Sequence, residues 1–309
     1  MRTRRPDLEA LPFKSPGFIA GQLFPFFQAA QKTGTLYFDD IVSDGTAETT
    51  RSLAAAATAS RIDSASTSFT CAEIIKRYKI DDSEILLRGG LDAAQAKMAR
   101  HGKRAIMDYL EAKAVAATFG DLASFSNRDI LTSFLQALDV AKEAVQDYGD
   151  GKVAVFGAQS VISRLKRYDE VVDRMKHTGV LVRDIRDVRS ISNEQLAAAL
   201  DVDMILPGPS TPWLGSGSAY DGYVGVCLLP DENVDPDEAV QLGRTIVYEE
   251  DGLYRVETYY SDDLISEVCD TRVWANMLAL NKECCYILRG VDEENTVTTT
   301  TTTTTTAAG

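Results

Sequence analysis

The sequence has little of what metal sites and nucleophilic active sites are usually made from. Its 309 residues include two histidines, His101 and His177, and five cysteines, none of them in C-x-x-C spacing. A zinc site needs clustered Cys and His ligands, and a serine triad needs a histidine base. We therefore expect no metal, no cofactor and no catalytic residue, and we interpret the cysteines as reduced, mostly buried thiols.

Other signals are also missing. No run of 18 apolar residues occurs, so no membrane span is expected. The basic start, Met1–Pro6, is not followed by an apolar stretch, so no secretory signal is expected. The segment that most resembles an enzyme motif, Gly215–Ser218, has neither the Lys-Ser/Thr of a phosphate loop nor a G-x-S-x-G elbow.

Negative charge is concentrated in the C-terminal two thirds of the chain. Residues 1–115 contain 16 Lys+Arg and 14 Asp+Glu, a net of +2, whereas residues 116–309 contain 16 and 32, a net of -16, and the two sum to -14. This excess of acidic residues disfavours nucleic-acid binding, which usually requires a basic face. The asymmetry suits an N-terminal part that lies on the acidic part of a neighbour, although plain solubility is an alternative explanation.

Residues 1–33 have the character of an arm. Arg2, Arg4 and Arg5 open it, prolines follow, and the apolar patch Leu23–Phe27 brings three phenylalanines close together. These rings need another surface, which is either the chain's own domain or a partner. Strand-like residues 35–38 and 69–80 then flank a small, polar stretch at 43–68, which predicts an extended excursion from the body.

A long helix is predicted from Ala93 to about Thr118, roughly 40 Å in length. Asp92 is the expected N-cap, with Gln95 completing a capping box, and Lys103 is expected to lie off the apolar stripe. The expected stripe consists of Leu91, Ala94, Met98, Ala105, Tyr109, Ala112 and Ala116.

A mixed lobe is predicted over residues 123–206, followed by a loop at 207–222 and then long strands. The lobe is expected to contain helices at 127–147, 160–168, 169–177 and 193–200, and strands at 152–156, 181–188 and 204–206. Later strands are expected at 223–229, 264–277 and 284–288, with a hairpin joining 245–249 to 253–259 across the turn Glu250–Gly252. The threonine run Thr298–Thr306 is low in complexity and is expected to be disordered.

Three segments resemble major capsid proteins of tailed bacteriophages, both in their residues and in their order along the chain: Phe24–Asp40, Lys76–Lys97 and Val268–Asn276. The resemblance covers about residues 11–290. It implies an α+β, Hong Kong-phage-type (Johnson) capsid fold with an N-terminal arm, an extended β-hairpin loop, a long spine helix, a peripheral domain and a mixed axial domain. The implied parts are the arm 1–33, the extended loop 34–80, the peripheral domain 81–122 and 253–290, the axial domain 123–252 and a disordered tail 291–309.

The resemblance also implies a function. The chain would be a non-enzymatic subunit that self-assembles into pentamers and hexamers, and these would form the icosahedral head of a virion around double-stranded DNA, bound without sequence specificity. Scaffolding, portal and decoration proteins would be its other partners, and the host bacterial cytoplasm its place of synthesis and assembly. The residues that we expect at assembly interfaces are Arg2, Arg4, Arg5, Phe24, Phe26, Phe27, Phe69, Arg77 and Trp213.

Two other readings remain open at this point. An encapsulin-like compartment would share the fold and enclose cargo enzymes in place of DNA. An acidic α/β hydrolase-type enzyme, from a different class, would need a pocket with convergent polar groups.

Overall fold

The computed structural model describes residues 2–12, 18–39, 64–130, 133–148, 151–177, 191–210, 213, 219–229, 241–248, 253–262, 264 and 266–291. Several expectations fall outside these residues and are not described. They are most of the polar excursion at 43–68, the strand at 181–188, the segment Gly215–Ser218, the turn Glu250–Gly252 and the threonine tail.

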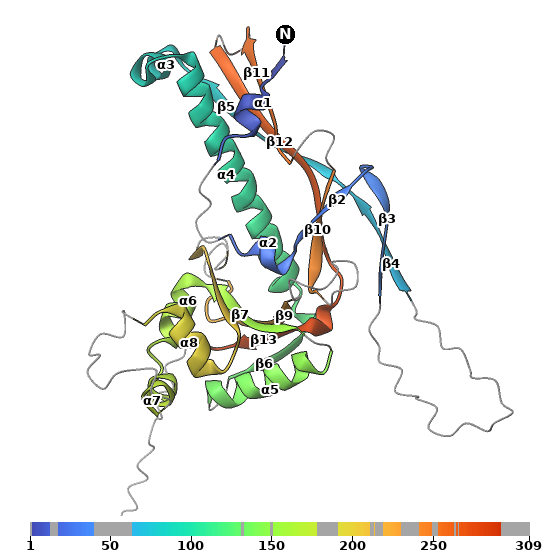
Figure 1. The fold of residues 1–309 in the computed structure, drawn as a ribbon, viewed down its shortest axis with the longest axis vertical. Coiled ribbons are helices and arrows are strands. Elements are labelled where there is room, and N and C mark those ends of the chain that lie inside the picture. The colour runs from blue at the N-terminus through green and yellow to red at the C-terminus, as the bar shows by residue number, and fades with distance from the viewer. Residues whose placement is uncertain are drawn as a thin grey trace, which may run out of the picture.

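The chain folds into an elongated region and a compact lobe, and both are mixed α+β (Figure 1). The elongated region consists of a six-stranded sheet, the helix α4 (Leu91–Thr118) and the short helices α1 (Pro6–Glu9), α2 (Ala20–Leu23) and α3 (Asp82–Arg88). Helix α4 runs along the elongated region and ends at the compact lobe, so a single helix joins the two (Figure 1).

Strand β12 (Ser266–Ala279) is the centre of the six-stranded sheet. It pairs antiparallel with β5 (Ala72–Ile80), β11 (Arg255–Ser261) and β10 (Gly243–Tyr248). The arm adds the two outer strands: β1 (Thr3–Arg4) pairs with β11, and β2 (Phe26–Ala29) pairs parallel with β10. The expected hairpin between residues 245–249 and 253–259 is wrong, because these two strands pair with successive halves of the 14-residue β12 and not with each other.

Helix α4 confirms the predicted long helix, but its start and its buried face differ from the prediction. It begins at Leu91 after Gly90, without a side-chain cap, so Asp92 and Gln95 form no capping box. Leu91 and Tyr109 of the expected stripe are exposed. The face that packs on β12 is centred on Gly102, where an added Cβ would lie 2.7 Å from Cβ of Thr271. The buried residues of α4 are Ala94, Gln95, Met98, Ala99, Gly102, Lys103, Ile106, Met107, Leu110, Glu111, Ala114, Val115 and Thr118.

Strands β3 (Thr33–Asp39) and β4 (Ser64–Thr70) form a separate antiparallel ribbon that extends away from the body (Figure 1). The Cys71 N–H donates to the Lys32 carbonyl at 2.7 Å and closes the base of this ribbon. Leu36 and Phe69 are buried at the same base, packed with residues of β2 and β10. The expected excursion from the body is therefore confirmed for its described strands.

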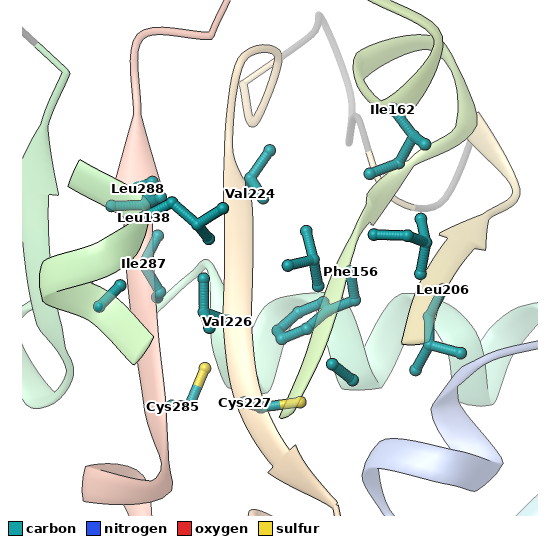
Figure 2. Close-up of a cluster of buried hydrophobic side chains, with 14 of the residues drawn as sticks. Leu138, Phe156, Ile162, Leu206, Val224, Val226, Cys227, Cys285, Ile287 and Leu288 are labelled. Atoms are coloured by element: carbon teal, nitrogen blue, oxygen red, sulfur yellow. The ribbon is translucent and has the colours of Figure 1, made fainter. Parts of the chain in front are cut away.

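The compact lobe is built on a five-stranded sheet in the order β6-β13-β9-β7-β8. Side chains of β9 and β7, including Val226 and Phe156, form its core with Leu138 and Ile287 (Figure 2). The strands are β6 (Ser126–Asp129), β7 (Lys152–Ala158), β8 (Met204–Gly208), β9 (Val224–Leu229) and β13 (Cys285–Arg289). The helices are α5 (Phe134–Gln146), α6 (Gln159–Leu165), α7 (Asp169–His177) and α8 (Asn193–Leu200).

Most elements of the compact lobe match the sequence predictions. Helix α8 has the predicted capping box, in which Ser192 and Gln195 each accept a backbone hydrogen bond from the other. The helix expected from residue 127 instead begins at Phe134 after the cap Ser133, and residues 126–129 form β6. Strand β8 continues through Pro207, which is tolerated because β8 is an edge strand.

Candidate assembly surfaces

The arginines of the arm pair with acidic residues of their own chain. Arg4 binds both carboxylate oxygens of Glu9 at 3.1 Å, and Arg5 contacts Asp7 at 2.8 Å and Asp92 at 3.2 Å. Arg2 lies 4.0 Å from Glu257 on the neighbouring strand β11. Arg2 and Arg5 therefore fasten the arm to β11 and α4, whereas Arg4 pairs within the arm, and the expected role of all three between subunits stays a prediction.

A buried lysine holds the next part of the arm. Lys103 of α4 donates to the carbonyl oxygens of Glu9 at 2.6 Å and Leu11 at 2.9 Å, and burial lowers its pKa. Leu8 of the arm packs against Ile80 and Met98. The expectation that Lys103 lies off the buried stripe is wrong. The side chain can be buried because its ammonium donates to main-chain carbonyls in place of water.

Three of the residues expected at interfaces are instead buried inside the subunit. Phe24 and Trp213 are completely buried, and Phe69 is nearly so. Phe24 packs against Gly243 of β10, and the Phe69 ring covers Gly34, where no Cβ would fit. In this conformation these rings lie in the subunit's own core, and their expected role at assembly interfaces stays a prediction.

Phe26, Phe27 and Arg77 remain accessible. Phe26 is 42% exposed and stacks on Phe18, and Phe27 lies under the Arg244 guanidinium at 5.4 Å. Arg77 forms a two-pronged ion pair, at 2.8 and 3.0 Å, with Asp270 directly opposite on β12. A contact with another subunit is a prediction for all three.

The sheet face opposite α4 is charged and internally paired. Asp270 is completely buried although it points away from the helix, because Arg77 and Arg272 cover it. Arg272 also binds Glu257 at 3.0 Å and Glu73 at 3.1 Å. The hydrogen bonds that Arg77 donates to Asp270 raise the pKa of Arg77, so this face carries a network of paired guanidinium groups and carboxylates.

The most exposed large apolar side chains of the described residues are two adjacent leucines on α3. Leu86 is 82% exposed and Leu87 is 85% exposed. Contacts brace the helix that carries them: within α3, Glu84 binds Arg88 at 2.8 Å and the Gly90 N–H donates to the Ile85 carbonyl at 3.1 Å, and Lys97 of α4 lies 3.7 Å from Glu84. A braced helix therefore presents two leucines to solvent at one end of the elongated region (Figure 1), which is typical of an interaction site.

In the part of the chain that the structure describes, the ionisable residues form no metal-binding cluster. No group of three or more His, Cys, Asp or Glu residues there could hold a metal ion. All five cysteines are free and buried, and burial raises the pKa of Cys227 well above its ordinary value. His101 is exposed beside the Tyr78 ring, and His177 is the last residue of α7. None of the helices within the described ranges has the length and apolar character to cross a membrane.

The arm, the extended ribbon, the long helix and the two sheets together make up the Hong Kong-phage-type capsid fold of tailed phages. Neither a protein-family model nor a curated protein matches the chain. Solved structures do match it over nearly their full length. A phage-related protein from Bordetella bronchiseptica RB50 aligns with 94% of this chain and 97% of its own, at a TM-score of 0.71 and 17% identity.

Two further matches come from a capsid structure and an encapsulin complex. The capsid protein of cyanophage P-SCSP1u aligns with 91% of this chain and 90% of its own, at a TM-score of 0.58 and 13% identity. An encapsulin from Synechococcus elongatus aligns with 90% of this chain and 89% of its own, at a TM-score of 0.53 and 8% identity. These similarities establish the fold of the chain.

Proposed function

We propose that this chain is the major capsid protein of a tailed phage or prophage. In this role it self-assembles into pentamers and hexamers that form the icosahedral head around double-stranded DNA. The observation that carries the proposal is the match of 91% of the chain to a chain of the cyanophage P-SCSP1u capsid, together with the match of 94% of it to a phage-related protein. A partial match confined to one lobe would support only a shared building block.

Features of the elongated region support a role that requires neighbours. A two-stranded ribbon is only marginally stable alone in water, and the β3–β4 ribbon stands away from the body (Figure 1). Strand β5 pairs with β12 along one edge, and no described strand pairs with its other edge. Unpaired edges of this kind invite another chain, as do Leu86 and Leu87 on α3.

The parts of the subunit then take the following roles. The elongated region is the peripheral domain, with α4 as its spine, and it includes β10 (Gly243–Tyr248) beyond the bounds expected from the sequence. The compact lobe is the axial domain, includes β13 (Cys285–Arg289), and meets its copies around the symmetry axes. The arm (1–33) and the extended loop (34–80) reach neighbouring subunits, which makes the contacts heterologous and lets them close into rings.

The acidic charge of the chain supports a shell that encloses DNA without gripping it, since a net charge of -14 disfavours binding to phosphate. We place the protein in the virion, after assembly in the host bacterial cytoplasm. Scaffolding, portal and decoration proteins are its further partners in this proposal, and its role is structural and not catalytic.

Negative-stain electron microscopy of the expressed protein, with light scattering on the same sample, tests the proposal. Closed shells, tubes or rings of subunits are the expected result, either alone or after co-expression with a phage scaffolding protein. A uniform monomer of about 34 kDa that persists with the scaffold would contradict the capsid assignment.

An encapsulin-like compartment is the second candidate, because an encapsulin from Synechococcus elongatus shares the fold. Both candidates form shells, so the contents distinguish them. Nuclease-protected DNA in particles recovered from the native source supports the capsid, whereas a co-purifying enzyme inside nucleic-acid-free particles supports the compartment.

A further inference from the structure

A buried carboxylate lies where the arm, the long helix and the compact lobe meet. Glu111 is on the C-terminal half of α4 and is 1% exposed. Two backbone N–H groups of the arm donate to it: Ile19 to Oε1 at 3.3 Å and Ala20 to Oε2 at 3.1 Å. The indole N–H of Trp213 donates to Oε1 from the other side.

Trp213 belongs to the compact lobe. Its backbone N–H donates to the Pro209 carbonyl at 3.2 Å, just beyond the end of β8. Its ring packs edge-on against Phe119 and Phe156, with centroids 5.5 and 5.6 Å away. Gly208 lies against the indole so closely that a Cβ there would be 2.2 Å from it. The indole is thus fixed in the lobe and reaches back to the helix.

The three donors depend on one another because they share one charge. A buried carboxylate loses its hydration, and hydrogen bonds must replace it. If one donor leaves, the buried charge is less well compensated. The conformation that the other two donors hold then becomes less stable. Burial also raises the pKa of Glu111, and the neighbouring Asp108 adds to this effect, which indicates that the three donors only partly offset the loss of water.

We propose that Glu111 is a latch that couples the arm to the compact lobe. The start of α2 and the Trp213 indole are held by the same carboxylate, so loosening either one loosens the other. In the proposed assembly the arm contacts a neighbouring subunit. A displacement of the arm by that contact would then change the hydrogen bonds of Glu111 and, through them, the position of Trp213 in the lobe. This coupling is a property of the subunit and holds whether or not the chain forms a capsid.

Hydrogen exchange on the full-length subunit tests the latch. In Trp213→Phe, which keeps an aromatic ring but removes the indole donor, the Ile19 and Ala20 amides should exchange about tenfold faster. Trp274→Phe is the matched control, because Trp274 lies on the outer face of the six-stranded sheet under Lys32. Rates are divided by those of Val268–Val273 amides in β12, so a general loss of stability cancels.

The Glu111→Gln variant shows whether the effect of Trp213→Phe depends on the carboxylate. The amide keeps one acceptor oxygen, but it replaces the other oxygen with a donor group and carries no charge, so the charge that the three donors share is removed. Adding Trp213→Phe to Glu111→Gln should therefore change the Ile19 and Ala20 exchange ratio by less than about twofold. The proposal is overturned if Trp213→Phe alone leaves that ratio unchanged, or if its effect is the same in the Glu111→Gln background.

Discussion

The compact lobe and the elongated region differ in how they use their side chains. The lobe has one large apolar core, and strand β9 at its centre is buried along its whole length. The elongated region has three small apolar clusters instead, and one face of its sheet carries ion pairs around Asp270. Only the lobe has a core of the kind that stabilises a domain without partners.

The difference also concerns edges and exposed apolar residues. In the elongated region β5 has an edge without a described partner, and Leu86 and Leu87 point into solvent. A region with small cores and open edges gains stability when a neighbour covers it. We therefore expect substitutions in the lobe to act on the folding of the subunit, and substitutions on the elongated region's surface to act on association.

The largest effect is expected for Phe156→Ala in the lobe. The Phe156 ring stacks on Phe119 and lies directly against Gly225, so its loss leaves a cavity and should lower the free energy of unfolding by about 3–5 kcal/mol. Ile75→Ala on the half-exposed edge strand β5 should cost under about 1 kcal/mol. Denaturant unfolding of the isolated subunit measures both, and equal losses would contradict the contrast between the regions.

Gly102→Ala should destabilise the subunit by about 1–3 kcal/mol through overpacking against Thr271. Intrinsic helix propensity alone would make the same change stabilising by about 1 kcal/mol. The sign of the measured change therefore shows which of the two effects is larger. Ala116→Gly on the exposed side of α4 is the control, where propensity alone should operate. Thermal unfolding followed by circular dichroism is the measurement.

Arg77→Ala should cost about 1–2 kcal/mol, because it removes two hydrogen bonds from a buried Asp270 that keeps only Arg272 and Tyr259. Lys79→Ala, two residues along the same strand, breaks an exposed pair with Asp81 and should have almost no effect. If both variants unfold at the same denaturant concentration, the network around Asp270 does not stabilise the fold.

The pH dependence of Glu111 reports on the joint between the two regions. Its pKa is raised in the folded state, so its favourable contribution is present at low pH and is lost as pH rises through the raised pKa. The melting temperature of the parent protein relative to Glu111→Gln should therefore increase as pH falls from about 7.5 to about 5. A difference that stays constant over this range would show that Glu111 does not titrate there.

The smallest effect on stability is expected for Leu86→Ser combined with Leu87→Ser. Both side chains are more than four fifths exposed, so unfolding should change by less than about 0.5 kcal/mol. Association of subunits, followed by light scattering, should nevertheless weaken. Tyr109→Ser, at an exposed position of α4, is the surface control, and equal association of all three proteins would remove α3 from the assembly surface.

Local patterns predicted those elements whose signals lie within a few residues. The capping box of α8 and the strands β7, β9 and β13 follow from such patterns. Pairing over long distances did not follow: the Asp-Gly turn signal favoured a hairpin, but β12 pairs with both of its expected strands. The expected Asp92 cap is also wrong, because the helix begins at Leu91 and Asp92 lies in its first turn, where its carboxylate binds Arg5.

The residues expected at assembly interfaces stay predictions. Arg77 and Phe26 lie on the surface, whereas Phe24 packs in the arm's contact with its own subunit and Trp213 packs in the compact lobe against Phe119 and Phe156. Lys103 and Glu111 were missed, although their spacing from Met107, Leu110 and Ala114 places them on the buried face of α4. A charged residue at such a position was the available signal, and only the folded arm and Trp213 explain how it is compensated.

The continuity of β4 with β5 has a mechanical consequence. The ribbon strand β4 passes through Cys71 into β5, and β5 is paired with β12 over nine residues. A force that draws the ribbon outward along its strands loads all nine pairs in shear at once, and does not peel them open one by one. The nine pairs therefore anchor the ribbon together, and tension on it is borne by β12, the longest of the described strands.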